Sequence, residues 1–490
     1  MRSRFVLNIV FYSLIVFQAI LTFYLPLMHL MNDSAWYYMT VHYFETGKYI
    51  HESTYPSFDT ASQYYPFLGY SVLLYITEKV YQLTCIDWAL QLKWLQFILY
   101  IFSAIMARKI VFSLTNKLHL GQIAGILFLI YYPYFQYTSA VMSEIYAVFA
   151  IISLVWLFVK TKEKSSPVLI TLMFLLGGYV VLIKPVFLSV TIIVTLYYII
   201  RIYKLRKLML YVYILPVLIF PVYQITVSKI CYSNTNLQTG MGWHLWNRVI
   251  HQDGLIPESS EALDNLKKIY AENGRKFKAG YWWNVTENLS KFGYKEMEIQ
   301  EICKQVAVDG IQENPLKYTL LTFRHFFRNF LEENENVIYY NSIDKYFISI
   351  NSFAIEQHHG PLSDRLMQQD YYKDFKGINT GLRINYFISE IFKKADFLFH
   401  NILIFVLYIF AGIYYLYKVF NNRFRKYQSE SLIWLAAFGI TFGSVLVEYV
   451  QARLMLPALI FVYMIIIIFI NDIITDFSNR KIVFKYFRKN

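Results

Sequence analysis

The chain begins with a long apolar run at residues 5–28, FVLNIVFYSLIVFQAILTFYLPLM, which leads directly into MHLMNDSAWYYMTVHYFETGKY at residues 28–49. The first stretch is long enough to cross the roughly 30 Å hydrocarbon core of a bilayer. It follows two arginines and is too long for the core of a signal peptide, so it predicts a retained membrane anchor. The second stretch places an acid, Asp33, where the chain leaves the membrane.

The composition extends this interpretation to the whole chain. Of its 490 residues, 57% are hydrophobic and 16% are charged, which lies outside the range of ordinary soluble domains. We therefore expect an all-α polytopic membrane protein with roughly ten transmembrane helices. The expected spans are 5–28, 88–107, 120–136, 140–159, 167–183, 185–200, 208–230, 398–417, 431–449 and 454–471. The net charge of +13 comes from short basic clusters between these runs, which indicates cytoplasmic loops and not a nucleic-acid partner.

One further apolar run, residues 66–83, could cross the membrane or lie flat in its interface. Loop charges favour a flat amphipathic helix, because all basic clusters then fall on the side of the N-terminus. This topology predicts a cytoplasmic N-terminus. It divides the chain into an N-terminal membrane module (1–230, with its first external loop at 29–87), an extracytoplasmic, mainly helical domain (231–397), and C-terminal membrane helices with a basic cytoplasmic tail (398–490).

Within the external domain, Asn314-Pro315 predicts the start of a helix with the sequence LKYTLLTFRHFFRNFL. Its expected apolar face consists of Leu316, Leu320, Phe323, Phe327 and Phe330, and its adjacent basic stripe of Lys317, Arg324 and Arg328. Such a helix suits the phosphate layer of a membrane. A packed helix with a solvated basic edge explains the pattern equally well.

Asp33 also has a plain structural explanation, since it could cap the short amphipathic helix that follows it. However, other ionisable residues are expected at the same membrane edge: Glu144, Lys184, Glu448 and Arg453. Charged groups near a bilayer cost free energy, about 2.5 to 3.5 kcal/mol at its centre for Asp, Lys or Arg. Several at one depth therefore predict a site, to which His42 and Glu45 could contribute.

Four stretches in order resemble the GT-C superfamily of membrane glycosyltransferases. The first is the external Asp33 with TGKY and YYPFLGYSVLLY, and the second is YYPYFQYTSAVMSEIYAVFAI around Glu144. The third is GGYVVLIKPVFLSV, with Lys184 before a proline. The fourth, EYVQARLMLPALIFVYM, resembles the last-span motif of the protein O-mannosyltransferase and aminoarabinose transferase branches. The resemblance covers most of the membrane part but not 231–397.

The resemblance implies an inverting transfer of a sugar from a polyprenyl-phosphate donor to an extracytoplasmic acceptor, which could be a lipid, a glycan or a protein. Asp33 matches the base that takes the acceptor's proton. Arg453 and Lys184 are candidates to hold the lipid phosphate. We expect a protein of the plasma membrane of a bacterium, with membrane lipids and the lipid-linked donor as partners.

The remaining residues leave alternatives open. Glu144 could assist Asp33, orient the acceptor, bind a metal or pair with a cation, and Glu448 could pair with Arg453. Either basic residue could instead extend along the membrane toward water. In the oligosaccharyltransferase branch an acid in the loop of Glu144 belongs to a divalent-metal site, but this chain lacks a DxD at Asp33, so no metal or other cofactor is expected.

The chain also departs from the family pattern at residues 64–66, and two rival functions remain. The aminoarabinose branch carries Lys-Pro-Pro where this chain has Tyr64-Tyr65-Pro66, which makes an identical substrate doubtful. A zinc site at His358-His359 is less expected than ordinary loop residues. The alternative functions are a transporter or flippase, or a polymerase or ligase, of lipid-linked glycans. Transporters often carry ionisable groups near mid-membrane, whereas here the expected charges gather at one edge, which favours a transferase.

Overall fold

The computed structural model describes residues 2–24, 37, 41, 44, 68–86, 88–164, 166–205, 208–232, 240–331, 391, 399, 401–447 and 455–487. These residues form helices and turns and contain no β-strand. Six helices among them are long and apolar enough to cross a membrane, or seven if one bent pair counts as a single span. The chain is therefore a multi-pass helical membrane protein. The expectation of roughly ten spans requires three shorter apolar helices, at 167–183, 185–201 and 212–227, to cross as well.

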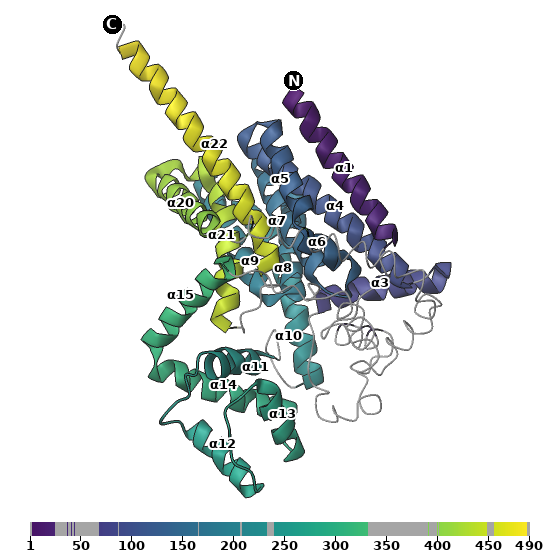
Figure 1. Cartoon of the computed structure of the whole chain (residues 1–490), viewed down its shortest axis with the longest axis vertical. Coiled ribbons are helices and arrows are strands. Elements are labelled where there is room, and N and C mark those ends of the chain that lie inside the picture. The colour runs from purple at the N-terminus through teal and green to yellow at the C-terminus, as the bar shows by residue number, and fades with distance from the viewer. Residues whose placement is uncertain are drawn as a thin grey trace.

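The membrane module is a bundle in which helices distant in sequence pack together (Figure 1). Its N-terminal helices are α1 (Arg2–Tyr24), α4 (Trp88–Thr115), α5 (Leu118–Ile130), α6 (Tyr132–Gln136), α7 (Glu144–Glu163), α8 (Pro167–Ile183), α9 (Leu188–Leu205) and α10 (Ile219–Tyr232). Short 3₁₀ segments, Pro185–Phe187 and Leu208–Leu218, precede α9 and α10. The C-terminal helices are α20 (Ile402–Lys418), α21 (Phe424–Val447) and α22 (Leu456–Phe487). They pack back on α4, α5, α7 and α9, and one apolar core joins both sets.

The helix pair α5 and α6 is bent by 61° at Tyr131, where a span is broken. Pro133, the second residue of α6, cannot donate a backbone hydrogen bond. The carbonyl of Leu129 is satisfied by side chains instead: Gln18 Nε2 donates at 2.7 Å and the Tyr100 hydroxyl at 3.0 Å. A break within a membrane helix is tolerated when neighbouring groups take over its backbone bonds in this way.

Helix α3 (Leu68–Thr84) lies crosswise to the long helices near one end of the bundle and packs on α4 and α8 (Figure 1). One face is buried, while Ile76, Val80 and Leu83 on the other are exposed. In the described part of the loop before it, Tyr37, Val41 and Phe44 are helical and have the i, i+4, i+7 spacing of one helix face. All three contact buried apolar residues. This arrangement agrees with a helix lying in the interface.

Residues 240–331 form helices with a second apolar core. They are α11 (Met241–Leu245), a π-helical segment at Trp246–Gln252, α12 (Glu261–Glu272), α13 (Trp282–Lys291), α14 (Glu296–Glu313) and α15 (Pro315–Leu331). Helix α12 is followed by its C-cap Asn273 and by Gly274, whose positive φ of 67° suits a glycine, and, as expected from the sequence, another helix begins at Pro315. Figure 1 shows α11 to α14 at the end of the molecule opposite both chain termini.

Candidate functional site

Two of the expected site residues meet in a buried ion pair. Lys184 Nζ donates to Glu144 Oε1 at 3.0 Å, and the two side chains are 11% and 2% exposed. Glu144 opens α7, where the helix dipole favours a carboxylate. Lys184 follows α8 in an extended conformation, which Pro185 favours in the residue before it. The ammonium group therefore points to an acid, and the alternative that Lys184 extends along the membrane toward water is wrong.

A glutamine of α4 holds the turn that leads to Glu144. Gln96 Nε2 donates to the carbonyls of Thr138 at 3.0 Å and Ala140 at 2.9 Å. Its Oε1 accepts a bond from the Tyr70 hydroxyl at 3.0 Å. The backbone of this turn is not part of a regular α-helix, so its buried carbonyl groups need other hydrogen-bond donors. Gln96 supplies them.

Tyrosines from four segments surround the ion pair. The rings of Tyr37 and Tyr70 lie edge to face with centroids 4.9 Å apart. The hydroxyls of Tyr146 and Tyr179 are 2.8 Å apart, and Tyr179 donates to the Gly69 carbonyl at 2.7 Å. Burial, followed by the neighbouring Tyr37 and Glu144, raises the pKa of Tyr70 well above its usual value. Tyr70 is therefore a neutral hydrogen-bond donor at this site.

The approach of α3 to this site depends on a glycine. A Cβ on Gly69 would lie 2.7 Å from the backbone nitrogen of Ile183, the residue before Lys184. Any larger side chain would push α3 away from the turn, since such contacts are too short for packed atoms. Gly69 therefore lets the interfacial helix contact the segment that carries Lys184.

Several polar atoms at this turn have no hydrogen-bond partner among the described residues. They are Glu144 Oε2, Ser139 Oγ and both amide atoms of Gln136, all of them buried. A buried polar atom left unpaired costs about 1–3 kcal/mol, and each such atom calls for an explanation. Their concentration beside an ion pair marks the turn as a candidate binding site for a polar group.

Five expected site residues lie outside the described residues: Asp33, His42, Glu45, Glu448 and Arg453. Described residues close to two of them in sequence are attached to the same turn. The hydroxyl of Tyr37, four residues after Asp33, is 3.1 Å from Ser143 Oγ. The hydroxyl of Tyr134 donates to the carbonyl of Leu456, three residues after Arg453, at 2.6 Å. Helix α6 and the turn that follows it thus join the first loop to the start of α22.

Two residues near the site were missed by the sequence interpretation. Gln96 and Lys93 lie one helical turn apart on α4 and are 0% and 1% exposed. The signal was present, because an ionisable residue inside an apolar span is expected to be functional or paired. The span at 88–107 was predicted from its mean hydropathy, and one lysine changes that mean too little to be noticed.

A second group of charges lies at the other end of α7, where Glu430 is buried and Lys162 and Asp472 are half-buried. Glu430 of α21 is 6% exposed and interacts electrostatically with Lys162 of α7. Asp472 of α22 accepts a hydrogen bond from the Tyr415 hydroxyl at 3.0 Å. Lys162 follows Glu144 by 18 residues in the same helix, a separation of about 27 Å. Partly or fully buried charges therefore lie at both ends of α7, and the sequence interpretation had singled out only those at the end that carries Glu144.

No group of three or more His, Cys, Asp or Glu side chains within the described ranges could hold a metal ion. His358-His359 lies outside these ranges. No family model matches the chain, and no curated protein matches it. The apolar helices define the class of the protein, which is a multi-pass helical membrane protein.

Proposed function

We propose that the protein is an inverting glycosyltransferase that moves a sugar from a polyprenyl-phosphate donor to an acceptor hydroxyl at the end of the bundle that carries Glu144. The observation that supports this proposal best is the turn before α7. It combines a buried ion pair, unpaired buried polar atoms and attachments to the segments that carry Asp33 and Arg453. A site for a phosphorylated lipid needs such polar groups close to apolar helices.

In the proposed reaction the acceptor oxygen attacks the anomeric carbon while Asp33 takes the hydroxyl proton. A positioned base of this kind contributes about 10² to 10⁴ in rate. The bond between the anomeric carbon and the phosphate oxygen breaks, and polyprenyl phosphate leaves with the electron pair. The leaving group is already an anion of low basicity, so it needs positive charge and not a second acid.

Arg453 is the main phosphate ligand in this proposal, because guanidinium binds phosphate through two parallel donors. Lys184 is held by Glu144 through one of its three N–H groups. The other two remain for the phosphate. Glu144 positions Lys184, and its second carboxylate oxygen is available to the acceptor. His42, Glu45 and Glu448 complete the proposed acceptor side, and no metal ion is required.

The test uses purified full-length protein in lipid nanodiscs with a panel of polyprenyl monophosphate and diphosphate sugars. Released lipid phosphate and new glycosides are measured by mass spectrometry with mixed cell-envelope acceptors. Wild type and the exposed control Asp264→Asn should release polyprenyl phosphate from one monophosphate donor, and Asp33→Asn should lose at least about 10²-fold. Release from a diphosphate donor alone would instead identify a polymerase or ligase.

A transporter of lipid-linked glycans is the second candidate, favoured by the buried Glu430 and the half-buried Lys162 and Asp472 at the opposite end of the bundle. Ionisable groups within a membrane protein often mark an ion or substrate pathway. The two functions differ in whether a bond is cleaved. If the labelled lipid moves between leaflets of proteoliposomes unchanged, with Glu430→Gln impaired and Asp33→Asn normal, the transferase proposal fails.

A further inference from the structure

Helix α15 has two apolar faces, of which the protein covers only one. Its buried face contains Thr322, His325, Phe326, Asn329 and Phe330. Phe330 stacks on Tyr408 of α20 with ring centroids 5.4 Å apart, and Phe326 packs against Phe438 and Phe442 of α21. This corrects the sequence expectation that placed Phe330 with Leu316 and Leu320 on one face. The packing of the buried face does not account for the remaining apolar residues of the helix, such as Leu316 and Leu320.

The second face is exposed along the whole helix. Five large apolar residues line it: Leu316 (71% exposed), Leu320 (62%), Phe323 (47%), Phe327 (43%) and Leu331 (44%). Their spacing of four, three, four and four residues places them on one side of the helix. A continuous apolar strip of this length is unusual on a water-exposed surface and indicates an apolar environment.

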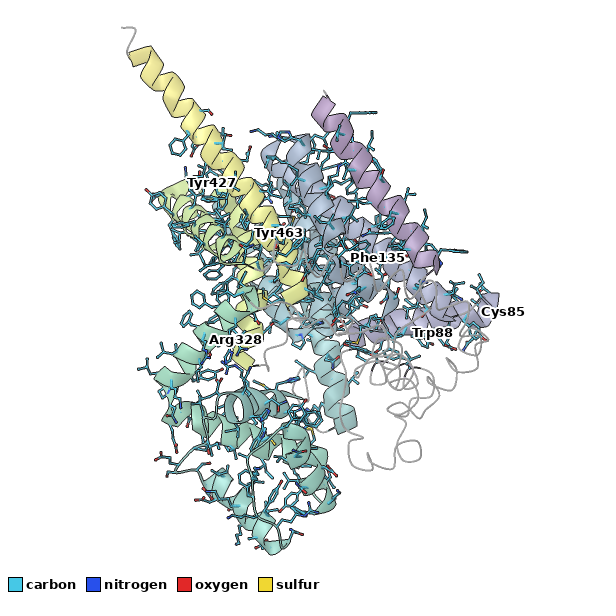
Figure 2. All side chains as sticks on the ribbon, viewed as in Figure 1. Cys85, Trp88, Phe135, Arg328, Tyr427 and Tyr463 are labelled. Atoms are coloured by element: carbon cyan, nitrogen blue, oxygen red, sulfur yellow. The ribbon has the colours of Figure 1, made fainter. Side chains whose placement is uncertain are left out.

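This strip continues onto a helix that is apolar enough to cross the membrane. The ring of Phe327 lies 4.8 Å from that of Phe405 of α20. Around Phe405, α20 exposes Ile402, Leu403, Val406 and Phe410. Tyr408, which contacts the end of α15, lies six residues into α20, or about 9 Å along it. The C-terminal part of α15 is therefore at the depth of the first turns of a span. Figure 2 shows Arg328 at this junction.

A basic stripe borders the exposed apolar strip. Lys317, Arg324 and Arg328 follow at intervals of seven and four residues, which places them together on the helix surface. Lys317 and Arg324 are exposed. Long basic side chains at a membrane edge extend toward the phosphate groups while their stems cover apolar surface. An apolar strip bordered by such residues is the pattern of a helix that lies in a membrane interface.

We propose that α15 is a membrane anchor of the helical domain formed by 240–331. Its exposed apolar strip lies among the acyl chains of the leaflet next to that domain. Lys317 and Arg324 bind the phosphates of anionic phospholipids in the same leaflet. This assignment is independent of the reaction the protein performs, and it decides between the two alternatives that the sequence left open for this helix.

The test places nitroxide spin labels on the full-length protein in nanodiscs, with the native cysteines Cys85, Cys231 and Cys303 replaced by serine. Labels are introduced singly as Leu320→Cys, Phe323→Cys and Phe327→Cys. The lipid reference is Phe410→Cys on α20, and the water reference is Glu272→Cys on α12. Power saturation then measures collision of each label with oxygen, which concentrates in acyl chains, and with a water-soluble nickel complex.

The expected result is that the three α15 labels resemble Phe410→Cys, with high oxygen and low nickel collision. Collision with nickel at the level of Glu272→Cys would show a solvated surface and overturn the proposal. Low collision with both reagents would show that protein covers the strip, either another segment of this chain or a second molecule, and would overturn it equally.

The lipid specificity is tested with the Phe327→Cys label in two lipid compositions. Replacing neutral phosphatidylcholine by anionic phosphatidylglycerol should shift the label deeper, and the double variant Lys317→Gln/Arg324→Gln should lose that shift. The matched control is Lys267→Gln/Lys268→Gln, which removes the same charge from α12. A shift that persists without Lys317 and Arg324 refutes their role.

A measurement without substitutions covers the case in which the cysteine-free protein does not fold. Wild-type protein is reconstituted with a phospholipid that carries a photoreactive carbene source in its acyl chain. After illumination, lipid adducts are mapped by mass spectrometry of peptides. Adducts on 316–331 at a frequency similar to 402–410 support the proposal, and their absence from 316–331 with strong labelling of 402–410 refutes it.

Discussion

The ion pair of Glu144 and Lys184 shows what single residues contribute to this protein. Sequence reasoning placed both residues at one membrane edge, because each follows a recognisable signal: an acid after a broken span and a lysine before a proline. It could not determine that they bind each other, since the contact depends on how α7 and α8 pack. Gln96 and Lys93 were missed because the mean hydropathy of the whole span hides single polar residues within it.

At the same scale, removing one member of the pair should destabilise the protein strongly. Glu144→Gln or Lys184→Met each leaves a buried charge unpaired, which costs about 3–5 kcal/mol. The double variant should lose clearly less unfolding free energy than the two single variants lose together. A double-mutant cycle of the unfolding free energy, measured in detergent, would show this.

The exposed pair Lys267 and Asp264, 3.1 Å apart on α12, is the matched control for this cycle. Exposed pairs typically contribute about 0–1 kcal/mol because water screens them. Equal coupling energies in the two cycles would show that the pair at the candidate site is no more than a surface contact.

At the scale of elements, the sequence predicts where most of the apolar helices lie, because apolar runs are local signals, but several boundaries differ: α4 ends at Thr115 instead of 107 and α22 at Phe487 instead of 471. The faces of the helices are harder to predict. The burial of Phe330 on α15 depends on the positions of α20 and α21, which its own sequence does not contain. The contact of the helical domain with α21 is a further example, since it includes a buried arginine, Arg248, that no local pattern distinguishes.

Arg248 joins the π-helical segment to the end of α21. Its Nε donates to the Val445 carbonyl at 2.9 Å, and its guanidinium group also pairs with Asp253. Asp253 in turn bonds His325 Nε2 at 2.8 Å. Arg248→Met should remove the bond to the end of α21 and leave Asp253 with His325 in place of two partners. We expect faster amide hydrogen exchange at 441–447, with no change for Lys268→Met on the surface of α12.

A glycine sets the distance between α20 and α21. A Cβ on Gly412 would overlap the ring of Trp434, whose Nε1 donates to the Tyr408 carbonyl at 3.0 Å. Gly412→Ala should therefore lower the unfolding free energy by about 1–3 kcal/mol despite the better helix propensity of alanine. Gly177→Ala is the control, because its Cβ would meet atoms no closer than 3.5 Å. Equal thermal stability of both variants would contradict this packing.

At the scale of the whole molecule, the structure places both termini at one end and 240–331 at the other (Figure 1). With the basic loops in the cytoplasm, Cys introduced at 272 should react with a membrane-impermeant maleimide in intact cells. Cys at 3 or 478, in a background without native cysteines, should react only after permeabilisation. The reverse pattern would invert the orientation, and labelling of 3 and 478 from different sides would contradict the arrangement of the termini.

The bond between Tyr134 and the Leu456 carbonyl spans 322 residues. A chain is synthesised from its N-terminus, so Tyr134 enters the membrane long before its partner exists. The contacts of α6, which leads into the turn before Glu144, are therefore complete only when α22 has been inserted. A nascent chain that stops before α22 would lack part of the site, which ties any activity at this turn to molecules in which α22 is in place.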